Sequence, residues 1–241
     1  MLTALLLAAA PFGPPDAPLR LSAGFGTGQL AADADGEADT EAHARTGQAA
    51  VEWLGGPWRA GLGYRTVLRD VERRCTPTAG DTTPGRCPQG GASGRDTRHA
   101  LSATAGWAFQ WAAASVGAAW RVRNTVDPDG GGGTTHTFGP VGHLRLGPAD
   151  FISLRAAWGD PAPETPGSGE ARAGVEFTPG DGRVLVGAVR EAPAWGLLLA
   201  GQVPLSPTIG LAVSGAAHPT HPERLVLVGV GLVFAWDLLA D

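Results

Sequence analysis

Large apolar side chains alternate with small or polar ones along much of the chain. The alternation is strongest over residues 224–236, where Val, Leu, Phe and Trp occupy every second position from Val226 to Trp236, and the positions between include Gly229 and Gly231. Because neighbouring side chains of a β-strand point to opposite faces, this pattern predicts a strand whose two faces meet different surroundings. The stretch is longer than the about 9–11 residues that a tilted strand needs to cross a bilayer.

The same pattern recurs along the chain, so we expect an all-β fold, an antiparallel transmembrane β-barrel of twelve strands that forms one domain over residues 19–236. Ten strands are the alternative, if the weakly alternating residues 183–191 pair differently. The expected strands cover residues 19–29, 42–54, 58–69, 98–111, 114–125, 137–146, 151–159, 170–178, 183–191, 195–203, 208–216 and 224–236.

Short turns and longer polar loops alternate between these strands. Brief periplasmic turns and large external loops are typical of outer-membrane barrels, and an even number of strands places both chain ends on the periplasmic side. Short turns are expected around Gly55–Pro57, Gly147–Asp150, Pro179–Gly182 and Pro204–Pro207, and long external loops at residues 30–41, 70–97, 126–136, 160–169 and 217–223.

Aromatic residues gather near the ends of the expected strands. Such rings settle at the two membrane interfaces of a transmembrane barrel, which predicts two aromatic girdles. Trp107 and Trp120 lie deeper in their strands and fit this pattern less well. The predicted girdles consist of Trp53, Trp58, Trp111 and Trp236 at the periplasmic ends and Trp158 and Trp195 at the external ends.

Composition and the N-terminal residues agree with an exported β protein. The 241 residues include 37 Gly and 20 Pro, which punctuate many short apolar runs, and the apolar fraction of 43% is too high for a disordered chain. Residues 1–10 combine an apolar core with small residues and are expected to be a signal peptide. The chain has 18 Arg, no Lys and a net charge of −5, which argues against nucleic acid as a partner.

Two cysteines, Cys75 and Cys87, lie in a polar stretch rich in Gly and Pro. In an exported chain this spacing predicts one disulfide that closes an external loop, whereas structural zinc would need four ligands.

The pattern across residues 19–236 resembles the bacterial outer-membrane β-barrel family, with a porin-like layout but no specific subfamily. Leu225–Trp236, whose alternating apolar residues end on an aromatic ring, looks like the barrel-assembly signal of that family, although Asp237–Asp241 follow it here. The resemblance implies a location in the bacterial outer membrane, contact with outer-membrane lipid and insertion by the barrel-assembly machinery.

Arginine dominates the small-residue face of the expected strands. Glu52, Glu170 and Glu176 are the acids expected on this face. We expect the arginines to line the lumen of a narrow passive channel for small anionic solutes. The alternative is a non-conducting structural or adhesive barrel in which these charges are paired. The lumen-lining arginines are expected to be Arg20, Arg59, Arg65, Arg69, Arg121, Arg123, Arg145, Arg155 and Arg172.

Other candidate chemistry is weak. The acidic run Asp33–Glu41 departs from the spacing of a calcium loop and is interpreted as a solvated external loop. His218 and His221 have no third ligand nearby, so no metal and no cofactor are expected. A lipid hydrolase is less favoured, because His99 and Ser102 are three residues apart and would point to opposite faces of a strand. We therefore do not expect an enzyme.

Overall fold

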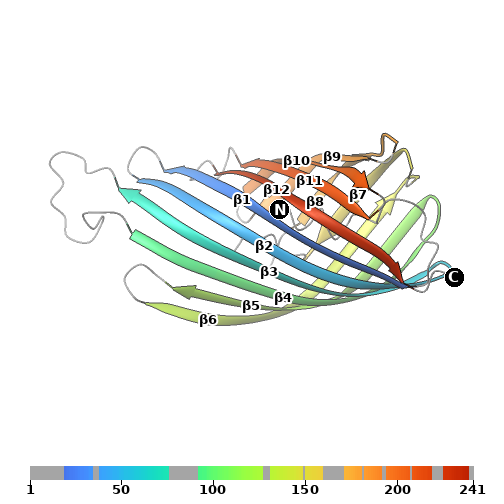
Figure 1. The fold of residues 1–241 in the computed structure, drawn as a ribbon, viewed down its shortest axis with the longest axis horizontal. Coiled ribbons are helices and arrows are strands. Elements are labelled where there is room, and N and C mark those ends of the chain that lie inside the picture. Colours follow the sequence, from blue (N-terminus) through green and yellow to red (C-terminus); the bar gives the residue numbers. More distant parts are fainter. Residues whose placement is uncertain are drawn as a thin grey trace.

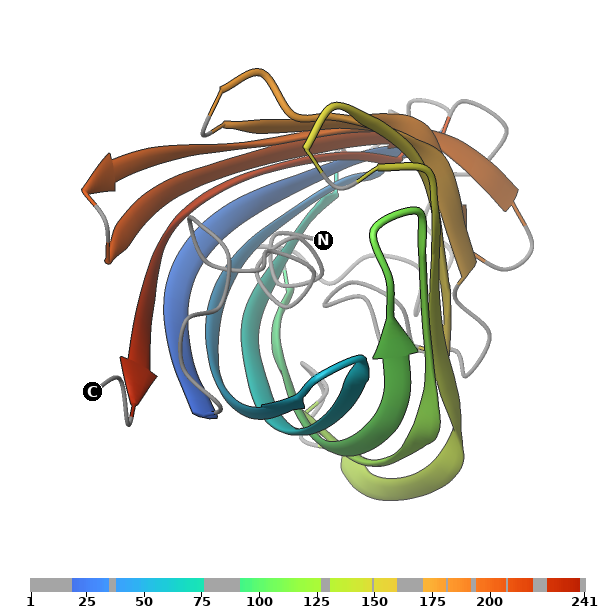
Figure 2. The same ribbon diagram turned by 90° about the vertical axis from the view of Figure 1, so that its right-hand side faces the viewer.

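In the computed structural model, the alternating segments form twelve antiparallel strands that close into a barrel, as Figures 1 and 2 show. The structure describes residues 19–34, 38–75, 92–126, 131–148, 150–159, 171–180, 182–191, 194–206, 208–218 and 225–238. The strands are β1 (Leu19–Ala34), β2 (Ala38–Gly55), β3 (Trp58–Cys75), β4 (Ala92–Ala108), β5 (Ala112–Val126), β6 (Gly132–Leu146), β7 (Ile152–Trp158), β8 (Ala171–Phe177), β9 (Arg183–Glu191), β10 (Ala194–Ser206), β11 (Ile209–His218) and β12 (Leu225–Leu238).

The barrel closes where β1 pairs with β12, in a register that runs from Leu19 opposite Leu238 to Ala31 opposite Val226. Every other strand pairs with its neighbours in sequence. Closure matters in a membrane, because each backbone N–H and C=O then has a partner in the next strand and no edge faces lipid. The prediction of twelve strands is confirmed. The ten-strand alternative is wrong, since β9 pairs with both β8 and β10.

Short turns join the strands at one end, which we call the turn end. Gly56 and Gly180 have φ angles of 62° and 59°, a backbone conformation that glycine adopts without steric cost. Backbone hydrogen bonds also link successive turns, from Ala108 N to Pro57 O and from Gly147 N to Trp111 O. Three neighbouring turns, from β2–β3 to β6–β7, are therefore hydrogen-bonded to one another.

The strands differ in length, which makes one wall of the barrel taller than the other. β1–β6 contain 15–18 residues each, whereas β7–β9 contain 7–9. Figure 1 shows β1–β6 extending past the ends of the shorter strands on the side opposite the turn end, which we call the loop end.

The long strands correct three of the predicted loops. Residues 30–41 are mostly strand, because β1 runs to Ala34 and β2 begins at Ala38, and the predicted loops at 70–97 and 126–136 are shortened in the same way. The acidic run is therefore not a loop throughout, since Asp33 and Asp39 are register partners. Outside the bilayer, water solvates both faces of a hairpin, so its strands continue on backbone hydrogen bonds without apolar alternation.

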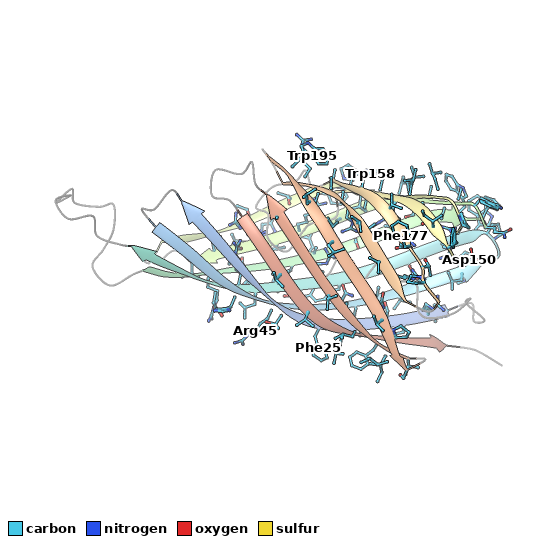
Figure 3. All side chains as sticks on the ribbon, turned by 90° about the horizontal axis from the view of Figure 1, so that it is seen from above. Phe25, Arg45, Asp150, Trp158, Phe177 and Trp195 are labelled. Carbon is cyan, nitrogen blue, oxygen red and sulfur yellow. The ribbon has the colours of Figure 1, made fainter. Side chains whose placement is uncertain are left out.

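The outer surface of the barrel is apolar. Leu62 is 62% exposed, and Figure 3 shows Phe25, Trp158, Phe177 and Trp195 pointing away from the wall. Small side chains such as Ala50 and Ala119 are buried on the other face. A soluble β-sandwich would bury its large apolar face instead, so the exposed band matches a barrel whose solvent is lipid. Among the described residues, no helix is long and apolar enough to cross a membrane.

The ladder between β6 and β7 is short and ends at two special residues. The register pairs Gly142 with Trp158 and stops there, although β6 continues to Gly132. Pro140 has no N–H to donate to a further rung. Gly159 has a φ of 67° and lies so close to the Pro140 carbonyl oxygen that a Cβ would overlap it. These residues lie where the described ladder between β6 and β7 ends.

Candidate functional site

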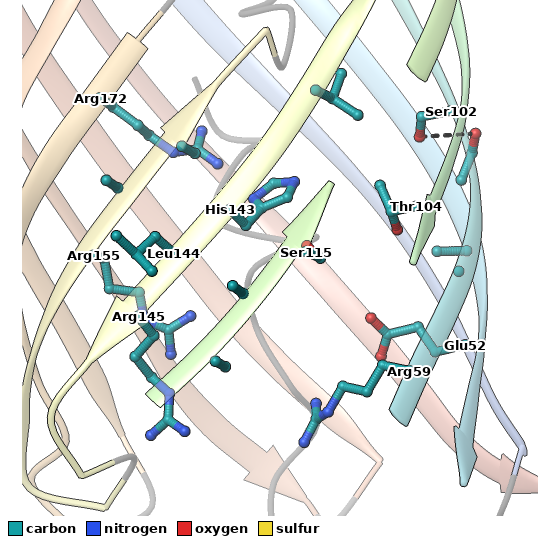
Figure 4. Close-up of a pocket in the computed structure, with 18 of the residues that line it drawn as sticks. Glu52, Arg59, Ser102, Thr104, Ser115, His143, Leu144, Arg145, Arg155 and Arg172 are labelled. Carbon is teal, nitrogen blue, oxygen red and sulfur yellow. Dashed lines mark hydrogen bonds between the residues drawn. The ribbon is translucent and has the colours of Figure 1, made fainter. Parts of the chain in front are cut away.

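The barrel encloses a cavity of about 290 Å³ lined by inward-facing residues of β2 to β10. Six arginines and two glutamates line it, which leaves an excess of four positive charges (six less two). Figure 4 shows several of these side chains converging on the lumen from both sides. The ionisable lining residues are Glu52, Arg59, Arg65, His143, Arg145, Arg155, Arg172, Glu176 and Arg183.

Arg145 is fixed at the turn end by backbone carbonyl groups. Its Nη2 donates to the carbonyl oxygen of Phe109 at 2.7 Å, and its Nη1 donates to those of Gly147 at 3.1 Å and Gln110 at 3.4 Å. These carbonyls belong to the β4–β5 and β6–β7 connections. Arg145 therefore joins two neighbouring turns, and its guanidinium is less available to a solute than the parity of β6 alone suggests.

Arg155 and Glu176 form an ion pair across β7 and β8, with 2.6 Å between Arg155 Nη2 and Glu176 Oε1. Both side chains are shielded, at 22% and 7% exposure. Buried Ser153 is the register partner of Glu176. A charge-assisted bond of this length holds both groups in place and neutralises one of the lumen arginines.

Glu52 lies between two arginines on the opposite wall. Arg20 is its register partner on β1 and is only 2% exposed, and Figure 4 shows Arg59 of β3 beside the Glu52 carboxylate. Both guanidinium groups attract the carboxylate electrostatically. One carboxylate shared by two cations leaves this wall with positive charge in excess.

Arg65, Arg121 and Arg172 lie further from the turn end. Arg65 is buried on β3, and Arg172 lines the cavity from β8. Arg121 of β5 donates through Nη2 to the carbonyl oxygen of Gly159. This bond links β5 to the end of β7 across β6, so Arg121 also has a structural role.

A second charged cluster lies near the loop end, centred on Asp96 of β4. Its two carboxylate oxygens accept hydrogen bonds from Arg98 at 2.5 Å and from Arg123 at 3.0 Å, and Arg69 is its register partner on β3. Burial by itself would raise the pKa of Asp96, but the hydrogen bonds from Arg98 and Arg123 outweigh it and hold the pKa below the ordinary value.

This Asp96 cluster lies beyond the apolar band of the outer surface. The band ends at two stacked pairs, Tyr64 with His99 and Trp120 with His136. Past them, the outer face carries an exposed ion pair between Arg95 and Asp70. Charged pairs on the outer face mark water rather than lipid, so Asp96 is outside the membrane-spanning part of β4.

The structure therefore places the nine predicted arginines on the inner face but at two levels. Arg69 and Arg123 belong to the loop end, and the other seven belong to the cavity or its walls. The sequence prediction missed Asp96, because β4 begins at Ala92, six residues before the predicted start, and it did not count Arg98, the first residue of the predicted strand. It also missed Arg183 and Gln202, whose inward position could have been found by extending parity to β9 and β10.

The structure describes the side chains of five of the six tryptophans predicted to form the aromatic girdles. Trp53, Trp58, Trp111, Trp158 and Trp195 are all exposed on the outer surface, as are Trp107 and Trp120. The backbone of Trp236 lies in β12, but its side chain is outside what the structure describes.

Several other predictions fall on residues that the structure does not describe. Cys75 ends β3, whereas Cys87 lies outside the described residues, so the disulfide stays a prediction. The same holds for the signal peptide at residues 1–10 and for an inward Glu170.

The histidine and serine residues considered for hydrolysis are separated. His99 faces outward and accepts or donates a hydrogen bond with the Tyr64 hydroxyl at 2.9 Å, while Ser102 faces inward and donates to the Gly63 carbonyl oxygen at 3.5 Å. His143 faces the lumen from β6. Within the described ranges, no three His, Cys, Asp or Glu side chains gather in a group that could hold a metal ion.

Comparisons with known proteins agree on the fold. No family model and no curated protein matches the chain. Among solved structures, the TodX deltaS2S3 mutant has a TM-score of 0.52 at 10% identity, with 96% of this chain and 94% of that chain covered. The transport unit of the autotransporter AIDA-I from Escherichia coli has a TM-score of 0.49 at 9% identity, with 98% of this chain and 96% of that chain covered. OprB from Pseudomonas putida has a TM-score of 0.38 at 7% identity, with 92% of this chain and 93% of that chain covered.

The closed antiparallel barrel, its apolar outer band and its likeness to the TodX mutant define the fold. The chain has the fold of an outer-membrane β-barrel, and this fold agrees with the outer-membrane location predicted from the sequence. No specific subfamily is matched.

Proposed function

We propose that the barrel is a narrow passive channel that favours small anions. The observation that carries this proposal is the cavity lining of six arginines against two glutamates. Between low-dielectric walls, an excess of fixed positive charge raises the local concentration of anions, and rings of arginine select anions in pores. The proposal assigns no catalytic activity and no cofactor to the chain.

The size of the bore suits small solutes. A barrel of twelve strands is wider than the side-chain-filled barrels of eight strands and narrower than porins of about sixteen strands. Buried inner residues are often alanine, including Ala157, Ala200 and Ala212, which leave room for the cavity of about 290 Å³. TodX is described as a monoaromatic hydrocarbon channel, which is consistent with a transport role for a barrel of this fold.

The outer surface supports two further parts of the proposal. Its exposed apolar side chains would contact outer-membrane lipid, and the alternating residues of β12 would be read by the barrel-assembly machinery during insertion. A non-conducting structural or adhesive barrel is the alternative. It is supported by the hydrogen bonds of Arg145 to carbonyl groups and by the ion pair of Arg155 with Glu176.

The first prediction is anion preference in planar bilayers. A salt gradient across the membrane should give a reversal potential of the sign set by anions. The double substitution Arg59→Gln and Arg172→Gln should lower the ratio of anion to cation permeability about two- to fivefold, because it removes two of the six cavity arginines.

The matched control carries Arg45→Gln and Arg190→Gln. Both of these arginines are exposed on the outer face, so the control loses the same charge without changing the lumen. Cation preference in the unmodified protein would contradict the proposal, and the absence of any conductance would favour the structural barrel.

A further inference from the structure

Two hydrogen-bond donors at the turn end of the lumen have no partner among the residues that the structure describes. They are Arg183 Nη1 and Gln202 Nε2. Arg183 and Gln202 are register partners on β9 and β10, and Gln202 is only 2% exposed. Because a buried polar group without a hydrogen bond is costly, an adjacent pair of such donors indicates a place for an acceptor.

The charge around this pair favours an anion. Glu176 attracts Arg183, but it is already bonded to Arg155 at 2.6 Å. Arg145 and Arg20 also act on Arg183, and the carbonyl oxygens that hold Arg145 leave its positive charge in place. The surroundings of the two donors therefore carry positive charge in excess.

The lumen wall beside the two donors is apolar. Leu185 lies two residues from Arg183 on the same face of β9, and Leu198 lies four residues from Gln202 on the same face of β10. Both leucines and Val189 line the cavity, and Leu198 and Val189 are buried. The walls built by β3 and by β6 to β8 carry the other cavity arginines. A hydrated inorganic anion gains nothing from an apolar strip, but a carboxylate with an apolar body does.

We propose that Arg183 and Gln202 form a binding subsite for small monocarboxylates with an apolar body, such as aromatic acids. The carboxylate accepts hydrogen bonds from Arg183 Nη1 and Gln202 Nε2, and the body lies against Leu185, with Leu198 further along the strip. This inference rests on the proposed anion channel and names its preferred class of solute.

The test compares benzoate, acetate and inorganic phosphate as probes of the whole barrel. Isothermal titration into protein in detergent, corrected with empty micelles, gives Kd without requiring conductance, and block of chloride current in bilayers gives a second value. Benzoate is expected to bind about tenfold more tightly than acetate or phosphate, since both the donors and the apolar strip contribute.

Three variants separate the parts of the subsite. Gln202→Leu and Arg183→Gln should each weaken benzoate binding about five- to tenfold, because each removes one donor. Leu185→Asn should reduce the preference for benzoate over acetate to near unity while the sign of the reversal potential is unchanged. Arg45→Gln, on the outer face, is the matched control and should bind benzoate like the unmodified protein.

Each outcome decides between the two proposals. Equal affinity for benzoate, acetate and phosphate, or benzoate binding that survives both donor variants, would overturn the subsite and leave the anion channel standing. Cation preference in bilayers would overturn the channel, and with it the solute class inferred here.

Discussion

At the scale of single residues, the inward arginines differ in what holds them. Arg145 is fixed by three backbone carbonyl oxygens, Arg155 by Glu176, and Arg98 and Arg123 by Asp96. Strand parity predicts which arginines face the lumen, but it does not predict their partners. Those partners decide which arginines are held against the wall.

Asp96 should stabilise the loop end of the barrel in a pH-dependent manner. Its folded-state pKa is lowered from the ordinary value of 3.8, so its contribution is present above that value and is lost as pH falls through the folded pKa. Asp96→Asn should therefore lower the free energy of unfolding by about 1–3 kcal/mol at neutral pH, because two shielded guanidinium groups lose their partner.

Urea titration in lipid vesicles at neutral pH and at about pH 2.5 measures this difference, which should shrink at the lower pH. Asp70→Asn is the control, since Asp70 pairs with Arg95 on the exposed outer face and should contribute less than about 1 kcal/mol. If Asp96→Asn lowers the free energy of unfolding by the same amount at both pH values, the stabilising role assigned to the Asp96 carboxylate is contradicted.

At the scale of elements, strand length exceeds the apolar pattern wherever the barrel leaves the membrane. β3 runs to Cys75, six residues beyond the predicted end at 69, because its neighbours β2 and β4 continue the backbone ladder. The opposite happens at β7, where Pro140 and Gly159 end the ladder with β6. Hydrogen bonding to neighbouring strands therefore sets where a strand ends, whereas the alternation of apolar and polar residues predicts only its central part.

Gly159→Ala should destabilise the barrel more than Gly180→Ala does. Both glycines have positive φ angles, 67° and 59°, so both substitutions carry a backbone cost of about 1–2 kcal/mol. A Cβ at Gly159 would also overlap the Pro140 carbonyl oxygen, while nothing lies within 4 Å of one at Gly180. Urea midpoints of the two variants provide the comparison, and equal midpoints would contradict a close approach of Gly159 to Pro140.

At the scale of the whole molecule, closure of β1 on β12 makes the barrel a single cooperative unit in the membrane. Its outer face exposes large apolar side chains such as Leu197, at 70%. Each of β1 to β12 pairs with a neighbouring strand on both sides, although the ladder between β6 and β7 covers only Gly142 to Leu146 of β6. Such a wall requires lipid or detergent on the outside, and it resists local unfolding because each strand is held on both sides.

The protein should therefore fractionate with outer membranes and show heat-modifiable mobility in detergent gels. Unheated samples should migrate as the compact barrel and boiled samples as the unfolded chain, whose mass is 24.5 kDa before the expected signal peptide is removed. Recovery of a monodisperse protein from the periplasm without detergent would be incompatible with this architecture.

The sequence by itself determined the number of strands, their order and the face that each residue occupies. The reason is local: in a wall one sheet thick, lipid on one side and lumen on the other impose a period of two on every strand. The tertiary structure alone decided the strand ends, the partners of the arginines and the pairing of Arg183 with Gln202. Those features depend on contacts between β9 and β10 or between β4 and β5, which bring together residues such as Asp96 and Arg123 that alternation cannot relate.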